Sequence, residues 1–130
     1  MVQDFKKLEV WQDAINFDKF LNTELENFPQ KEIYAMTSQL RRASLSISNN
    51  IAEGCGKESD KELKSYLSNA MGSCKEVESM IISANEKGYI TPLTFSKLNE
   101  EINRIGKRLN VFTQRIKQKI EMGKMGSETP

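Results

Sequence analysis

Six cationic side chains lie between residues 102 and 120, a stretch that has no acidic residue. They contribute +6 to a chain whose net charge is +1, so all other residues together carry −5. At about 100° per residue, four of the six lie within about 60° of one another on a helical wheel. These four form the cationic stripe: Arg104, Arg108, Arg115 and Lys119.

A row of cations on one helix is suited to contact successive phosphates of RNA or DNA. Arg41 and Arg42 could extend such a surface. The same four cations could instead pair with carboxylates of a neighbouring helix, or favour the C-terminal end of their own helix dipole. The residue types leave both interpretations open.

Residues suited to catalysis are scarce. The chain has no histidine, which excludes His-dependent triads and most zinc geometries. Glu53 and Glu76 are candidate inward carboxylates, but carboxylate-bridged metal bundles also require Glu-x-x-His pairs. The GCGK at residues 54–57 lacks the spacing of a phosphate-binding loop. We therefore predict a protein that is not an enzyme and needs no metal or cofactor.

The two cysteines are predicted to be reduced thiols, because they form neither a C-x-x-C pair nor a disulfide framework. Cys74 falls on an apolar helix seam and is expected to be buried. Cys55 lies between two glycines and could be exposed and reactive. No apolar run approaches the roughly 20 residues of a membrane span, and MVQDFKKLEVW lacks a signal-peptide core. We expect a cytoplasmic protein without membrane contact.

Four segments with helical periodicity must position these residues, and no stretch alternates with period two. The predicted helices run from about Leu8 to Phe28, from about Gln30 to Glu53, from Ser59 to Gly88, and onward from Thr91-Pro92. Short loops join them, so the predicted fold is all-α, an up-down-up-down four-helix bundle. Residues 1–120 are predicted to form this single domain, and residues 121–130 to be a disordered tail.

Specific residues mark the predicted ends and seams of the helices. Ser59 and Glu62 have capping-box spacing, Thr91-Pro92 supplies an N-cap, and Gly54, Gly56 and Gly88 are terminators. Two seams are predicted as Leu8, Trp11, Ala14, Ile15, Leu21, Leu25 and Phe28, then Ile33, Met36, Leu40, Ala43, Ile47 and Asn50/Ile51. The other two are Leu63, Leu67, Ala70, Cys74, Val77, Ile81 and Ala84, then Phe95, Leu98, Ile102, Ile105, Leu109, Phe112 and Ile116.

A polar stripe flanks the apolar seam of the second predicted helix. Arg42 and Glu53 point the same way but are 11 residues apart, roughly 16 Å along the axis, so they cannot pair within one helix. Serine and asparagine compete with the helix backbone, which favours a packed polar contact with another helix or subunit over a solvated face. The stripe consists of Gln39, Arg42, Ser46, Asn49 and Glu53.

The third predicted helix has small residues opposite its seam. A glycine inside a helix costs roughly 1 kcal/mol relative to alanine, and close approach of a second helix would offset that cost. The alternative is an ordinary exposed face. We predict contact on this side too, and hence a homo-oligomer. The small-residue face comprises Ser65, Ser68, Gly72, Ser79 and Ser83.

The order of three motifs resembles the 23S rRNA intervening-sequence protein family of four-helix bundles. These are FKKLEVWQDA, then FPQKEIYAMTSQLRRASLSISNNIAEG, then AMGSCKEVES, and the resemblance covers roughly residues 5–118. NIAEG at residues 50–54, preceded by QLRRA and followed by Gly72, Ser73 and Glu76, is specific in combination. Lys57 stands where many members have arginine, which keeps the charge.

The family is similar to the accessory protein of diversity-generating retroelements, a pentamer that binds nucleic acid and a reverse transcriptase. The resemblance thus implies a homo-oligomer, with a pentamer favoured, and implies RNA, DNA or a protein such as a reverse transcriptase as a partner. We therefore expect a non-catalytic oligomeric accessory protein that binds RNA or DNA through the cationic stripe. The alternative is a protein–protein scaffold with no nucleic-acid binding.

Overall fold

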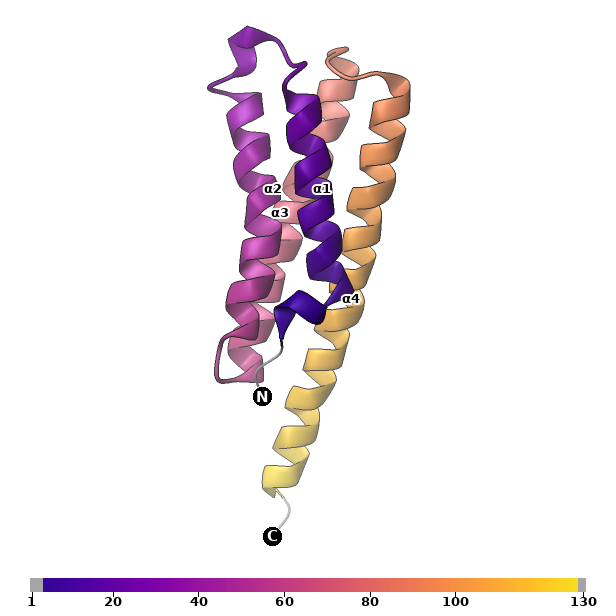
Figure 1. The fold of residues 1–130 in the computed structure, drawn as a ribbon. Helices are drawn as coiled ribbons and strands as arrows, with labels where there is room; N and C mark the ends of the chain where they lie inside the picture. Colours follow the sequence, from indigo (N-terminus) through magenta and orange to yellow (C-terminus); the bar gives the residue numbers. More distant parts are fainter. Residues whose placement is uncertain (1–3, 129–130) are drawn as a thin grey trace.

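The computed structural model describes residues 4–128, with side chains through residue 124. All secondary-structure elements in this part of the chain are helical. In order they are η1 (Phe5–Lys7), α1 (Glu9–Leu25), η2 (Gln30–Glu32), α2 (Met36–Cys55), α3 (Asp60–Glu86) and α4 (Pro92–Glu128). The four long helices alternate in direction, as Figure 1 shows. Each packs against two neighbours, so that α1 lies diagonally across from α3, and α2 from α4. The predicted all-α, up-down-up-down four-helix bundle is confirmed.

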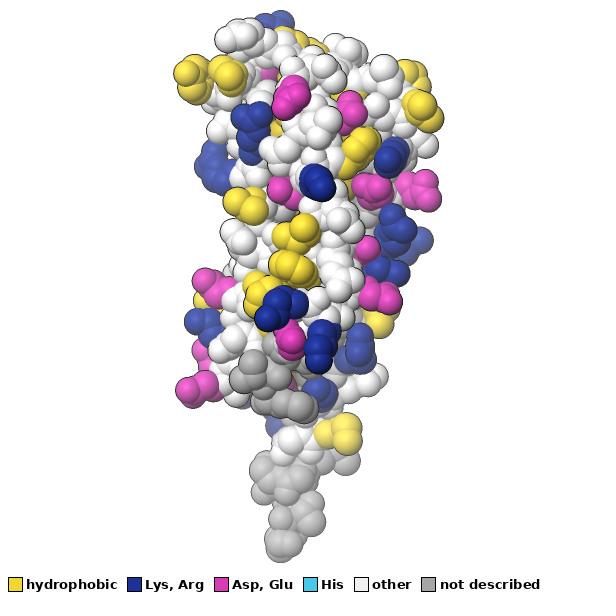
Figure 2. Space-filling model, viewed as in Figure 1, with side chains coloured by type: hydrophobic (Ala, Val, Ile, Leu, Met, Phe, Trp, Pro, Cys, Tyr) yellow, Lys and Arg dark blue, Asp and Glu magenta, His cyan; other side chains and the backbone are white. Residues whose placement is uncertain are grey.

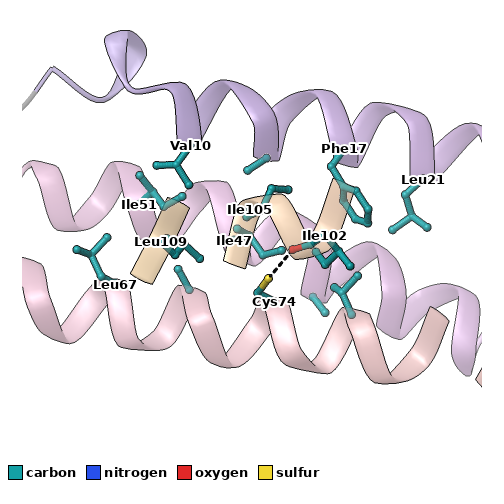
Figure 3. Packing of buried hydrophobic residues seen from close by; sticks show 14 of the residues in the cluster. Val10, Phe17, Leu21, Ile47, Ile51, Leu67, Cys74, Ile102, Ile105 and Leu109 are labelled. Atoms are coloured by element: carbon teal, nitrogen blue, oxygen red, sulfur yellow. Dashed lines mark hydrogen bonds between the residues drawn. The ribbon is translucent and has the colours of Figure 1, made fainter. Parts of the chain in front are cut away.

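The core lies along the bundle axis and receives apolar side chains from all four helices (Figure 3). Every predicted seam residue of α3 is buried, and so is every one of α4 except Phe95, which packs partly buried against the core. Cys74 lies in the middle of this core, where its Sγ donates to the backbone oxygen of Ile102 at 3.5 Å. The heptad spacing therefore identified the inward faces of α3 and α4 correctly.

Two predicted helix starts are confirmed by their caps. The Ser59 hydroxyl accepts from the backbone N–H of Glu62 at 3.2 Å, and the Thr91 hydroxyl accepts from the N–H of Thr94 at 3.1 Å. Gly88 follows α3 with a φ of 74°, the left-handed conformation that glycine adopts without a steric cost. The caps and Gly88 therefore predicted the end of α3 and the start of α4 to within two residues.

The first half of the chain corrects the predicted boundaries. The Phe28 ring packs against that of Tyr89, and the Tyr89 hydroxyl donates to Glu32 at 2.7 Å. These contacts hold residues 26–35 in a connection, so α1 ends at Leu25 and α2 begins only at Met36. Ile33, predicted for the core seam, is exposed as a result, and α2 in turn runs on past the predicted end at Glu53 to Cys55.

The seam predicted for α1 is also partly wrong. Ile15 is exposed, whereas Val10 and Phe17, which the predicted seam omitted, are buried. All three positions are apolar, so the choice between them depends on how α1 is rotated about its axis. That rotation is set by packing against α2 and α4, which the local spacing does not report.

The C-terminal end differs from the prediction as well. Helix α4 continues to Glu128, eight residues past the predicted domain end, and its last turns extend beyond the other helices in Figure 1. No proline interrupts this stretch, and Lys124 pairs with Glu121 at 3.5 Å one turn away. The predicted disordered tail is therefore helical through Glu128, while residues 129 and 130 lie outside the described residues.

Candidate nucleic-acid interface

The structure divides the cationic stripe of α4 into one paired and three exposed side chains. Arg108, with 39% of its side chain exposed, forms ion pairs with Glu9 at 3.2 Å and with Asp13, both on α1. Surface pairs of this kind are worth about 0–1 kcal/mol, so their main consequence is to neutralise charge. The exposed members are Arg104, Arg115 and Lys119.

A hollow of about 390 Å³ lies beside the stripe, between α4 and the start of the chain. Its apolar lining comes from both segments, and Val111 in particular is 57% exposed. Four cations and one carboxylate surround this apolar lining, a net charge of +3. The residues that line it are Lys7, Leu8, Glu9, Val10, Lys107, Arg108, Val111, Phe112 and Arg115.

A second basic hollow, of about 400 Å³, lies on the opposite flank of α4, against α3. Four lysines and one glutamate line it, again a net charge of +3, and Lys124 is paired with Glu121. The C-terminal half of α4 therefore has positive charge on both flanks. The lining residues are Lys61, Lys64, Lys117, Ile120, Glu121 and Lys124.

Figure 2 shows part of this surface from the α1 side. Lys and Arg side chains are spread over this face, several of them in the lower half of the molecule, with acidic side chains among them. Sequence reasoning missed Lys7, Lys61 and Lys64 because they belong to other elements. Nothing in the local sequence pairs them with α4.

Arg41 and Arg42 do not join this surface. Both are exposed on α2, which lies diagonally across the bundle from α4. The Nε of Arg41 donates to the side-chain oxygen of Asn22 on α1 at 3.1 Å. The two arginines therefore belong to a different side of the molecule from the cationic stripe.

The polar stripe of α2 borders a groove of about 240 Å³ against α3. Within it the hydroxyls of Ser46 and Ser73 lie 2.8 Å apart. One turn along α2, the Asn50 amide donates to the Ser46 backbone oxygen at 2.8 Å. Arg42 of α2 and Glu76 of α3 also line the groove. Ser46 is half-buried, whereas the other stripe members are exposed in this chain: Gln39, Arg42, Asn49 and Glu53.

The small-residue face of α3 is on the surface of the chain. A Cβ built at Gly72 would meet nothing within 4 Å, so no neighbouring helix of the described chain requires a glycine there. Ser65, Ser68 and Ser79 are likewise exposed, and Ser83 is half-buried.

Both thiols are buried, which corrects the expectation that Cys55 could be exposed and reactive. Burial raises the pKa of each thiol to about 11. A thiolate is the nucleophilic form, so at pH 8 neither side chain is activated or accessible. We expect both to be inert to a disulfide reagent such as DTNB in the folded protein, and two thiols per chain to react in urea. Rapid reaction of one thiol without denaturant would contradict this assignment.

Neither a membrane span nor a metal centre is found in the part of the chain that the structure describes. No helix between residues 4 and 128 is long and apolar enough to cross a membrane. Over the same range, no group of three or more Cys, Asp or Glu side chains is placed to hold a metal ion.

Comparison with known proteins supports the resemblance seen in the sequence. The model of the 23S rRNA-intervening sequence protein family matches residues 6–111. A solved structure from Bacteroides thetaiotaomicron VPI-5482, described as a protein with unknown function from the S23 ribosomal protein family, is similar in fold. Its TM-score is 0.73 and its identity 22%, over 80% of this chain and 97% of that one.

No match is found among curated proteins. The family model, by contrast, covers well over half of the chain, from the turn before α1 into the C-terminal half of α4. The chain belongs to the 23S rRNA-intervening sequence protein family.

Proposed function

We propose that this protein is a non-catalytic, oligomeric accessory protein that binds RNA or DNA through the C-terminal half of α4. The observation that supports this most is the pair of basic hollows, each with a net charge of +3, on the two flanks of that half-helix. Lysines from outside α4 (Lys7, Lys61 and Lys64) extend the surface beyond the cationic stripe and offset the neutralisation of Arg108 by its ion pairs. Family membership supports the fold only, and the proposed function is inferred from the distribution of charge.

Phosphate contacts release counterions, so affinity falls linearly with salt on logarithmic axes, by about 0.9 per phosphate on duplex DNA and 0.7 on single strands. We expect micromolar binding of mixed-sequence RNA or DNA at about 50 mM salt, with most of it lost by about 200 mM. Replacing Lys107, Arg115 and Lys119 together by glutamine is expected to reduce the slope by about 2 on single strands. Fluorescence anisotropy of a labelled oligonucleotide measures both quantities.

The matched control removes three exposed lysines elsewhere on the chain, Lys19, Lys31 and Lys87, by the same change to glutamine. Both triple variants lower the net charge equally, so only a local site distinguishes them. Equal losses in the two would mean that net charge alone attracts the nucleic acid. Absence of binding by wild type at low salt would overturn the proposal.

The assembly state is the second part of the proposal. The exposed small-residue face of α3 and the exposed polar stripe of α2 support contact with further copies, and the family resemblance favours a pentamer. Leucine at Gly72 is sterically free in a single chain, because a Cβ there meets nothing within 4 Å. We expect Gly72→Leu to weaken the oligomer while leaving the helical content unchanged. Gel filtration with light scattering measures the molar mass of both proteins. A monomeric wild type at micromolar concentration would contradict the predicted oligomer.

A protein–protein scaffold is the second candidate, and the ion pairs of Arg108 favour it. They use one stripe cation within the chain instead of leaving it for phosphate. A protein partner such as a reverse transcriptase fits either candidate. Binding of a partner protein by a variant that has lost nucleic-acid binding would favour the scaffold.

A further inference from the structure

The hollow between α4 and the N-terminal segment combines two surfaces that a phosphate site alone does not require. Leu8, which is half-buried, and Val111, which is exposed, form an apolar floor from its two sides, with the buried side chains of Val10 and Phe112 behind them. A single exposed apolar side chain is ordinary, but Val111 shares a concave surface with Leu8, so the two present a continuous apolar patch. At about 390 Å³ the space is within the roughly 300–1,000 Å³ of small-ligand pockets.

The cations around that floor are placed to hold a phosphate backbone. Lys7 and Lys107 come from opposite sides of the hollow and are exposed. The Arg115 guanidinium carbon lies 5.8 Å from the centre of the Phe112 ring, so a planar cationic group lies beside an aromatic one. The one carboxylate in the lining, Glu9, is paired with Arg108.

An apolar floor with a cationic rim matches an unpaired nucleotide better than a duplex. In a duplex the base faces are stacked and their edges paired, so only phosphates and groove edges reach a protein surface. In a single strand the base can turn out and pack on apolar, aromatic or guanidinium surfaces. The basic hollow on the other flank of α4 provides further cations along which the strand could continue.

We propose that this hollow takes one unpaired base of single-stranded RNA or DNA, with the flanking phosphates held by Lys7, Lys107 and Arg115. The inference rests on the proposed function and specifies its ligand: a single strand rather than a duplex. The base packs on Val111 and Leu8, and Arg115 stacks beside it. Acidic peptides, which offer charge but no planar ring, fit the floor less well.

The test compares oligo-U and oligo-dT of about 12 nucleotides with a duplex of equal length, by anisotropy at low salt. Val111→Gln removes the apolar contact without changing charge, and the exposed side chain makes misfolding a minor concern. We expect it to weaken single-strand binding about tenfold, the loss of one base-packing contact, and to leave duplex binding unchanged. Leu93→Gln is the matched control, an exposed leucine in the first turn of the same helix.

A second measurement locates the base directly. Photo-crosslinking of 5-iodouracil-substituted single strands to wild-type protein is expected to label residues 5–10 or 107–115, with a lower yield in Val111→Gln. Crosslinks confined to other segments would overturn the assignment of the base to this hollow.

The outcomes separate the two proposals. Equal or tighter binding of the duplex, or an unchanged single-strand affinity in Val111→Gln, overturns this inference and leaves the proposed function intact. Failure of wild type to bind any of the oligonucleotides overturns both. Displacement of labelled oligo-dT by a glutamate-rich peptide at equal concentration would assign the hollow to protein recognition and overturn this inference.

Discussion

Replacing Gly54 by valine is expected to lower the free energy of unfolding by about 2–3 kcal/mol. Gly54 is buried in the last turn of α2, where a Cβ would lie 2.7 Å from the Cβ of Tyr66 and 3.0 Å from a methyl carbon of Leu63. Tyr66 cannot withdraw by rotating its side chain, because its Cβ is attached to the backbone. The two helices must therefore separate to admit the new side chain.

Gly123→Val is the matched control, since Gly123 is also helical and its Cβ would meet nothing within 4 Å. Its effect is expected to stay within about 0.5 kcal/mol. Urea melts at one protein concentration compare the two, because any oligomer would make stability depend on concentration. If Gly54→Val unfolds at the same urea concentration as wild type, the close approach of α2 and α3 is not required for stability. If Gly54→Val is destabilised as expected, the contact with Tyr66, rather than helix termination, explains the glycine of NIAEG, since α2 ends one residue later.

Replacing Leu109 by alanine is expected to cost about 3 kcal/mol, within the 2–5 kcal/mol typical of buried leucines. Leu109 is fully buried and projects from α4 toward the axis, where Val10, Ile51 and Leu67 of the other three helices also point (Figure 3). Truncation removes its apolar burial and leaves a cavity that four rigid helices cannot close completely.

The comparison variant is Val111→Ala, two residues along the same helix and mostly exposed. It is expected to change stability by less than about 0.5 kcal/mol. The difference between the two variants, read from urea melts as above, measures mainly burial, because their helix propensities differ by less than about 0.7 kcal/mol. A Leu109→Ala loss below about 1 kcal/mol would mean that the centre of the bundle repacks freely.

The sequence by itself determined the helix count, the direction of each helix and the inward faces of α3 and α4. Their apolar residues recur at regular heptad spacing, and the caps at Ser59 and Thr91 involve residues only three positions apart. The seams and the caps are set by the geometry of a single helix, and the short loops between helices determine their alternating directions. The same reasoning failed at α1, where Ile15 and Phe17 are both apolar and only the neighbouring helices choose between them.

Only the tertiary structure decided which charges remain available at the candidate site. Arg108 pairs with Asp13 across 95 residues of sequence, and Lys7 and Lys107 line one hollow from its opposite sides. Gly54 likewise acquires its role from Tyr66 on the next helix. A helical wheel gives the direction of a side chain relative to its own axis. Its partners depend on how the helices are rotated and offset against one another, and packing of the whole core sets that arrangement.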